Sequence, residues 1–495
     1  MFQVINNLKR HEVLYKIWMG ISGFAVLSAI FYFDAYFSVT QYMPDSIPVH
    51  HDDYSNYSMG AEAFQWSWNR PFSTYVIHLL GLAGPAWLSA AIRILSVLFV
   101  LFSWVLLCQV IKPKMYWLML FAFGAAIFST PVIVEYARYT GMITHLLSGC
   151  LGLASVIALF RSADECHQLR SGRWWLLLSV LLLVLSSLAK EDFILFYALS
   201  LVYTVMRWPL QQRRLITVAG LGLLLCVALI AASKLLALSS FLGVVDPLSP
   251  YYVNTTPVSI INTVGLYLLG ANHPAMHLHG RLVAFIFVAV TLATICVSFH
   301  KRRFYHTAYF ILASLTLIAP YSVLPNHVNA YYELVWLPMV IAAAASANTE
   351  IFQQVSNSSA WRYRAPALAL LLVATIFSIS DYPMRKSIAQ WYDARTQSNL
   401  RLFSILQLNR LSINASRVVC ITGADAFSPW FMHDAKYLNG VMNLHSTWVI
   451  LSNPTSSEYS GFVASAAYSS GRVRVVKSPN EFLNDCLRID LKEQS

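Results

Sequence analysis

The sequence predicts an α-helical polytopic membrane protein with about eleven transmembrane helices and a small C-terminal α/β domain. Hydrophobic residues make up 57% of the 495-residue chain, charged residues make up only 12%, and the mean hydropathy is +0.56. This composition is too apolar for a soluble globular protein. Long apolar runs recur up to about residue 380 and then stop. We therefore expect a transmembrane domain at 1–380 and a separate domain at 381–495.

Eleven apolar runs are candidates for transmembrane helices, although several are shorter than the roughly 20 residues that an isolated helix needs to cross a bilayer. Neighbouring helices must shield the short ones. The first run follows Lys9, Arg10 and Lys16 but is long for a signal peptide, so we interpret it as a retained helix. The candidates are Ile17–Phe37, Trp87–Ile111, Trp117–Thr130, Met142–Phe160, Trp174–Ala189, Phe193–Met206, Leu215–Leu238, Leu282–Phe299, Ala308–Val323, Tyr332–Ala347 and Ala365–Ser380.

The distribution of basic residues predicts the orientation, because Lys and Arg in short loops stay on the cytoplasmic side. With the N-terminus inside, the outer loops hold only Arg70, Arg138, Lys190 and Arg281. The sixteen on the inner side are Lys9, Arg10, Lys16, Lys112, Lys114, Arg161, Arg170, Arg173, Arg207, Arg213, Arg214, Lys301, Arg302, Arg303, Arg362 and Arg364. The formal net charge of +11 is thus a sign of membrane topology, and we expect no nucleic-acid partner.

The C-terminal stretch 381–495 has the pattern of a small α/β domain outside the membrane. Asn399–Leu411 has helical spacing, and Pro479–Cys486 is predicted as a second helix. The predicted strands are Arg417–Thr422, Thr447–Leu451 and Arg472–Val476. Gly423 after the first strand is a single turn glycine without a phosphate-binding motif. This domain is expected to act as a lid or as a docking domain for an acceptor substrate.

Among the seven cysteines, only Cys420 and Cys486 form a candidate disulfide pair outside the membrane. Cys108, Cys150, Cys226 and Cys296 lie in apolar runs, where a cysteine usually acts as a small hydrophobic residue.

The most informative polar residues are His51, Asp52, Asp53 and Tyr54, in the first outer loop, 38–86. Charged groups beside a bilayer are costly and usually serve chemistry or ion passage. Other titratable and aromatic residues are predicted on the same side. They include Trp66, Trp68, Arg70, Glu135, Arg138, Lys190, Glu191, Asp192, His273, His277, His279, His327, Tyr331 and Tyr332.

This plan resembles the GT-C class of polytopic glycosyltransferases. The resemblance rests on Asp52 and Asp53, the run Trp66 to Pro71, and Lys190-Glu191-Asp192. Within the class, the chain is most similar to bacterial serotype-converting O-antigen glucosyltransferases, which modify lipopolysaccharide. The plan covers about residues 1–380, and the C-terminal domain contributes nothing to the match. The resemblance implies a multi-pass protein of the bacterial inner membrane with its N-terminus cytoplasmic and its C-terminus periplasmic.

The resemblance also implies a reaction, the transfer of a sugar from a polyprenyl-phosphate donor to a polysaccharide, glycolipid or other lipid-linked acceptor on the outer face of the membrane. Asp52 and Asp53 are the candidate bases for the acceptor hydroxyl. Arg138, Lys190, Arg70 and Arg281 are the candidate contacts for the donor phosphate. The candidate substrate-binding residues are His51, Tyr54, Trp66, Trp68, Glu135, Glu191, Asp192, His327 and Tyr331.

Each candidate also has a structural explanation. Asp53 suits the N-cap of a helix predicted at Tyr54–Ala63, Glu135 and Arg138 have the spacing of an ion pair, and Lys190 or Arg281 could reach the interface as isolated cations. Arg93, inside the second apolar run, could neutralise an acid or reach the lipid phosphate. The aromatic residues, among them Tyr75 and Tyr332, suit either an interfacial belt or sugar stacking.

No cofactor follows from the sequence, although the outer histidines together with Asp52 and Asp53 are also suited to a divalent metal. Two other function classes remain open. A transporter or flippase would hold charges along a path at mid-bilayer and often has repeated halves, which are not evident here. An O-antigen polymerase or ligase would share the substrates, but it would be expected to place its arginines in a large late outer loop.

Overall fold

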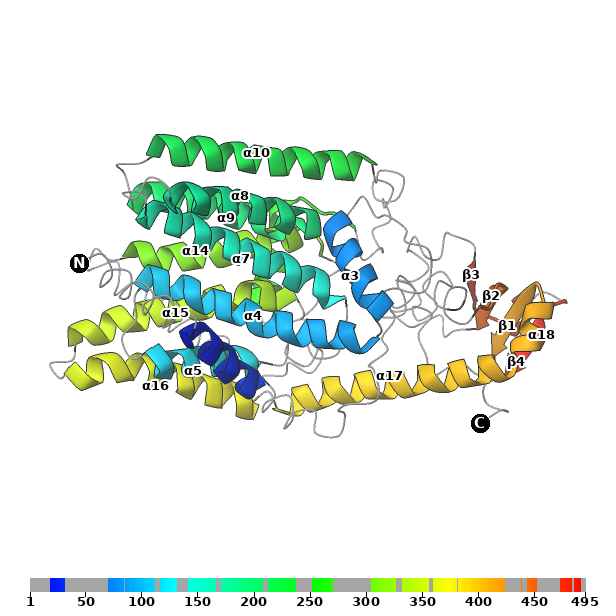
Figure 1. Ribbon diagram of the computed structural model, residues 1–495. Coiled ribbons are helices and arrows are strands. Elements are labelled where there is room, and N and C mark those ends of the chain that lie inside the picture. The colour runs from blue at the N-terminus through cyan, green and yellow to red at the C-terminus, as the bar shows by residue number, and fades with distance from the viewer. Residues whose placement is uncertain are drawn as a thin grey trace.

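The computed structural model describes residues 18–31, 70–83, 85–111, 116–130, 141–165, 171–207, 212–236, 252–269, 304–325, 332–355, 359–380, 382–422, 438, 443–451, 472–482 and 485–490. Within these ranges the chain forms a helical bundle followed by a small parallel sheet (Figure 1).

The bundle consists of long apolar helices that run side by side (Figure 1). They are α4 (Pro85–Ile111), α5 (Tyr116–Phe128), α7 (Met142–Asp164), α8 (Ser171–Ala189), α9 (Ile194–Arg207), α10 (Gln212–Leu236), α14 (Phe304–Ser322), α15 (Glu333–Val355) and α16 (Ser359–Ser380). The chain also forms helix Trp18–Phe31, α3 (Pro71–Ala83) and α12 (Pro257–Leu269). α3 falls inside the predicted loop 38–86 and crosses the end of the bundle at which α8 ends (Figure 1).

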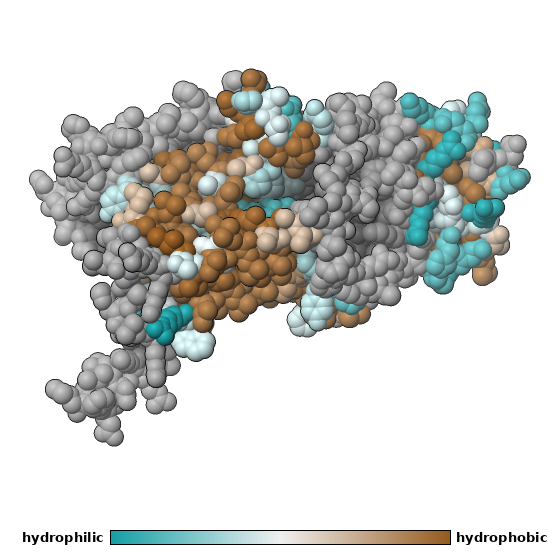
Figure 2. All heavy atoms as spheres, turned by 90° about the horizontal axis from the view of Figure 1, so that it is seen from above, coloured by the Kyte–Doolittle hydropathy of each residue, from teal (hydrophilic) through white to brown (hydrophobic). Residues whose placement is uncertain are grey.

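Three helices in the described ranges are long and apolar enough to cross a membrane. They are Ala90–Ile111, Met142–Asp164 and Gly172–Ala189, and shorter apolar helices accompany them. Leucines and other large apolar side chains are exposed along the bundle, as on Leu177, Leu181, Leu221 and Leu224. Figure 2 shows hydrophobic residues over the bundle and hydrophilic ones over the sheet. This part of the chain is therefore consistent with a helical membrane protein. The predicted run Leu282–Phe299 lies outside the described residues.

Helices α7 and α8 are joined by serine contacts at intervals of seven residues. Ser162 Oγ donates to the carbonyl of Gly172, and Ser155 and Ser179 each donate to the carbonyl of the other. One repeat further on, Ser186 donates to the carbonyl of Ser148 at 2.9 Å. Small side chains let the two backbones approach closely, and their hydroxyls hydrogen-bond across the interface. This register fixes the end of α8 against the start of α7.

Two glycines of α7 make room for aromatic side chains from neighbouring elements. A Cβ at Gly152 would lie 2.5 Å from the ring of Phe193, and one at Gly149 would lie 2.5 Å from the ring of Phe99. Phe193 follows directly after Asp192, so its ring anchors the connection between α8 and α9 in the core.

The C-terminal domain contains a parallel four-stranded sheet in the order β3-β2-β1-β4. Its strands are β1 (Val418–Thr422), β2 (Thr447–Leu451), β3 (Val473–Val476) and β4 (Leu487–Asp490). The three predicted strands are confirmed, whereas β4 was not expected. Of the predicted helix Pro479–Cys486, the described residues form only the 3₁₀ helix η5 (Pro479–Glu481), and the prediction is wrong at its end, where Cys486 is not helical and directly precedes β4.

A disulfide joins Cys420 on β1 to Cys486, which precedes β4, with the two Cα atoms 5.8 Å apart. The candidate pairing from the sequence is thus present. The long helix α17 (Tyr382–Leu408) and the short helix α18 (Arg410–Ala415) lead from the bundle to the sheet. In Figure 1, α17 leaves the bundle at the end crossed by α3, so the sheet lies beyond that same end.

Candidate functional site

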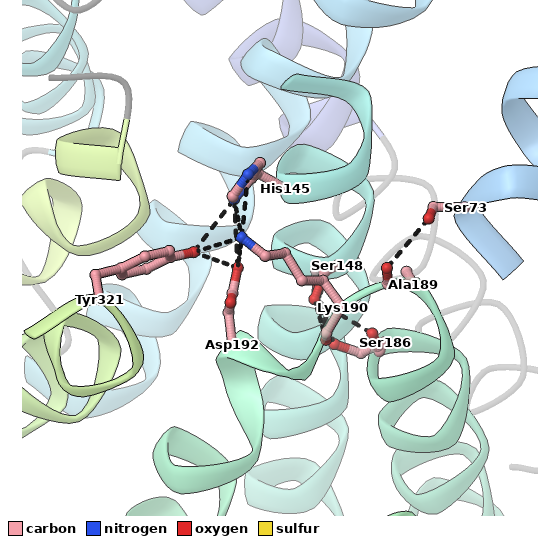
Figure 3. A network of polar contacts seen from close by, with 8 residues as sticks. All are labelled: Ser73, His145, Ser148, Ser186, Ala189, Lys190, Asp192 and Tyr321. Carbon is pink, nitrogen blue, oxygen red and sulfur yellow. Dashed lines mark hydrogen bonds and ion pairs between the residues drawn. The ribbon is translucent and has the colours of Figure 1, made fainter. Parts of the chain in front are cut away.

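Lys190 lies in a tight connection between α8 and the 3₁₀ helix η1 (Glu191–Phe193), where its backbone is extended. The last carbonyls of a helix need partners outside its own hydrogen-bond ladder. Here Ser73 of α3 donates to the carbonyl of Ala189 at 3.1 Å, and Ser148 of α7 donates to the carbonyl of Lys190 at 2.9 Å. Serines from two other helices therefore hold Lys190 in place (Figure 3).

Four side chains converge at this connection from three parts of the fold (Figure 3). Lys190 Nζ lies 2.9 Å from Nδ1 of His145, 3.0 Å from the hydroxyl of Tyr321 and 3.3 Å from Oδ2 of Asp192. The hydroxyl of Tyr321 donates to Asp192 Oδ2 at 2.5 Å and lies 3.2 Å from His145 Nδ1. His145 Nδ1 is 3.4 Å from the same carboxylate oxygen. We call these four residues the Lys190 cluster.

Aromatic rings enclose one side of the Lys190 cluster. Tyr321 and Tyr332 stack with their ring centroids 4.1 Å apart, and Lys190 Nζ lies 4.8 Å and 5.2 Å from the two centroids. These distances allow cation–π attraction. Tyr332 was assigned from the sequence to an aromatic set that suits an interfacial belt or sugar stacking, but its ring is buried against this cluster. Tyr75 from the same set is exposed on α3.

The Lys190 cluster is almost completely removed from solvent, with Lys190 4% exposed and Asp192 1% exposed. Burial lowers the pKa of the Lys190 ammonium to about 8, against the opposing effect of the Asp192 carboxylate. Burial alone would raise the pKa of Asp192, but the charge of Lys190 and the hydrogen bonds from His145 and Tyr321 hold this pKa below its ordinary range. The buried acid and base therefore stabilise each other's charged form.

Arg70 adds a second positive charge at the border of the cluster. It immediately precedes α3, it is partly exposed, and its charge further lowers the pKa of Lys190. The ammonium of Lys190 carries three N–H donors and has three neighbours within hydrogen-bonding or ion-pairing distance. An incoming anion would have to replace one of these neighbours at Lys190, whereas Arg70 is closer to the surface.

Among the predicted site residues, the structure brings Lys190 and Asp192 together and places Arg70 close enough to affect their electrostatics. Glu191, also predicted, is partly exposed in the same turn, and its charge raises the pKa of Lys190. Arg93 lies within α4, and its Nε atom is buried with no hydrogen-bond partner in the described ranges. The other predicted residues lie outside the described part of the chain; they are His51, Asp52, Asp53, Tyr54, Trp66, Trp68, Glu135, Arg138, Arg281, His327 and Tyr331.

Sequence reasoning missed His145 and Tyr321. His145 is a titratable residue one turn into an apolar helix, and such a residue is a functional candidate by default. Tyr321 had no comparable signal, because a tyrosine at the end of an apolar run is typical of a membrane interface. In the described ranges, no group of three or more His, Cys, Asp or Glu side chains is arranged to hold a metal ion.

The chain matches no protein family model, no curated protein and no solved structure.

Proposed function

We propose that this protein is a membrane glycosyltransferase of the bacterial inner membrane. It would transfer a sugar from a polyprenyl-phosphate donor to a polysaccharide or glycolipid acceptor. The observation that carries the proposal is the buried Lys190 cluster at one end of an apolar bundle, with Arg70 at its border.

The chemistry of such a donor fits this arrangement. Its polyprenyl chain requires an apolar surface, which the exposed leucines of the bundle supply. Its leaving phosphate needs neutralisation, which arginine and lysine provide. The acceptor hydroxyl needs a carboxylate base, for which the sequence offers Asp52 and Asp53. These acids precede Arg70 in the same predicted outer loop.

We assign different parts to the two cations near the site. Arg70 would contact the phosphate directly, because the residue is partly exposed and the planar fork of an arginine suits phosphate oxygens. Lys190 would act from within, as a fixed positive charge held by Asp192, Tyr321 and His145. A fixed charge in a site of low dielectric stabilises a developing anion without having to reorganise.

The test is transfer of a radiolabelled sugar from a polyprenyl-phosphate donor in membranes that contain the full-length protein. We expect Asp52→Asn or Asp53→Asn to lower the rate by roughly 10²–10⁴-fold, which is typical for the loss of a general base. Arg70→Gln should weaken donor use by roughly 10- to 150-fold, because a charge-assisted hydrogen bond contributes about 1.5–3 kcal/mol. Arg173→Gln removes the same charge from an exposed position at the far end of α8 and is the matched control.

Wild-type rates in all three site variants, or no transfer by the wild-type protein with any polyprenyl-phosphate sugar, would reject the proposal. The location of the C-terminal domain is tested separately, with a reporter that is active only in the periplasm fused after Ser495. Activity is expected, because α17 leaves the bundle at the end that carries Lys190, which we propose to be the outer end.

A second candidate function is a proton-coupled transporter or flippase. The specific observation in its favour is that the Lys190 cluster consists of titratable groups in mutual contact inside a helical bundle, as in proton relays. If the protein is such a transporter, proteoliposomes loaded with a pH-sensitive dye would show substrate-dependent proton movement. The variant Asp192→Asn would abolish this movement. A glycosyltransferase would show sugar transfer without a proton flux.

A further inference from the structure

A second polar cluster lies at the opposite end of the bundle from Lys190. It is formed by Arg207 at the end of α9, His306 near the start of α14, and Gln109 near the end of α4. Helix α9 begins four residues after Lys190 and has 14 residues, so it separates the two clusters by roughly 20 Å. We call the second group the Gln109 cluster.

Tyr203 joins the members of the Gln109 cluster. Its hydroxyl lies 2.6 Å from Nδ1 of His306, and it accepts a hydrogen bond of 3.3 Å from Nη1 of Arg207. The same guanidinium nitrogen donates to the backbone carbonyl of Gln109 at 3.4 Å. Tyr203 is held in turn by Tyr309, on which it stacks with a centroid distance of 4.3 Å. Residues of three helices therefore position Arg207 and His306.

Within the part of the chain that the structure describes, the side chain of Gln109 has no hydrogen-bond partner. Both Nε2 and Oε1 are buried, and neither atom forms a hydrogen bond. An unsatisfied buried polar atom is destabilising, so an amide in this position calls for a ligand that can both accept and donate a hydrogen bond. Arg207, whose guanidinium donates to the backbone carbonyl of the same residue, brings a positive charge to this part of the bundle and favours a ligand with an anionic acceptor.

We propose that the Gln109 cluster binds the phosphodiester head group of an anionic glycerophospholipid. Phosphate oxygens would accept hydrogen bonds from Arg207 and from Gln109 Nε2, and a hydroxyl of the head group would donate to Gln109 Oε1. Basic pockets between transmembrane helices are suited to such head groups. The flanking residues fit a lipid, because Met206 is 75% exposed and Tyr305 is 51% exposed, next to Arg207 and His306 respectively. Inorganic phosphate could satisfy the same donors but offers no glycerol hydroxyl.

The experiment measures the thermal unfolding midpoint of the purified full-length protein in detergent during titration with lipid. Phosphatidylglycerol is expected to stabilise the protein in a saturable way, whereas phosphatidylcholine and inorganic phosphate are not. Arg207→Gln should raise the half-saturating concentration of phosphatidylglycerol by roughly 10- to 150-fold, as expected for the loss of a charge-assisted hydrogen bond. Arg173→Gln, an exposed arginine at the same end of the bundle, should leave this concentration unchanged.

Gln109→Leu separates a lipid site from a purely structural role. It removes the unsatisfied amide, so the lipid-free protein should be at least as stable as the wild type, while the response to phosphatidylglycerol should weaken. If Arg207→Gln does not fold, Arg207→Lys retains the charge without the planar fork and should still bind lipid more weakly than the wild type. Equal stabilisation by both lipids, saturation by inorganic phosphate, or an unchanged lipid response in Gln109→Leu would overturn the proposal.

Discussion

The two ends of the helical bundle differ in whether their buried polar side chains have partners. At one end, Lys190, Asp192, His145 and Tyr321 lie within hydrogen-bonding or ion-pairing distance of one another. At the other end, Arg207 donates to the backbone carbonyl of Gln109, and both polar atoms of the Gln109 side chain are buried without a hydrogen-bond partner among the described residues.

This difference separates two kinds of site. A network that satisfies itself is preorganised and acts mainly through its electrostatic field, because its donors are already engaged. A buried group without a partner is stabilised only when a ligand arrives. The Lys190 cluster should therefore contribute to stability without a ligand, and the side-chain amide of Gln109 should contribute only with one.

The largest expected effect tests the internal balance of the Lys190 cluster. Asp192→Asn removes the countercharge of a buried ammonium and should lower the free energy of unfolding by about 3–5 kcal/mol. Glu191→Gln makes the same chemical change at the partly exposed neighbouring residue and should have little effect. The double variant Lys190→Met with Asp192→Leu should regain much of the loss, since no unpaired charge remains. Chemical denaturation would measure the free energy of unfolding of the wild type and of the three variants. An Asp192→Asn protein as stable as the wild type would contradict the prediction.

The dependence of stability on acidic pH tests the same ion pair. The pKa of Asp192 is held below its ordinary value of 3.8 by Lys190, so between the two values the unfolded chain binds more protons than the native protein. Stability therefore falls as the pH drops through this range. We expect the unfolding midpoint of the wild type to fall more steeply than that of Asp192→Asn below about pH 4. Parallel curves for the two proteins would indicate that the pair is not charged in the native state.

A smaller effect is expected at Tyr321, whose hydroxyl contacts both charges of the cluster. Tyr321→Phe keeps the ring stacked on Tyr332 but deprives Asp192 of a donor, which should cost about 1–3 kcal/mol. The control is Tyr305→Phe, an exposed tyrosine at the start of the same helix. Equal melting temperatures for Tyr321→Phe and the wild type would show that the hydroxyl is dispensable.

The smallest effect has the opposite sign and concerns the far end of the bundle. Gln109→Leu removes two unsatisfied atoms and should raise the lipid-free unfolding free energy by up to about 2 kcal/mol. Differential scanning fluorimetry in a lipid-free detergent would detect this gain. A clear destabilisation would mean that the amide is satisfied in the native protein and that the contrast between the two ends is not real.

The sequence by itself determined the composition-level features of this protein. Apolar runs predicted most of the helices, because a helix that crosses the hydrocarbon core of a bilayer needs about 20 predominantly apolar residues. Short apolar runs rich in β-branched residues predicted three of the four strands. The repeat of small residues at 148, 155 and 162, matched by 172, 179 and 186, was also present in the sequence and could have predicted the pairing of α7 with α8.

Only the tertiary structure decided which polar groups meet. Lys190 and Asp192 are close in sequence, but Tyr321 is more than a hundred residues from both, and no local pattern encodes that distance. β4 escaped prediction for a similar reason: Leu487–Asp490 is a short segment that becomes a strand by pairing with β1. Hydrophobic periodicity predicts which face of a single helix or strand is buried. The Lys190 cluster instead depends on the packing of α7, α8 and α14, which brings their polar side chains within about 3 Å of each other.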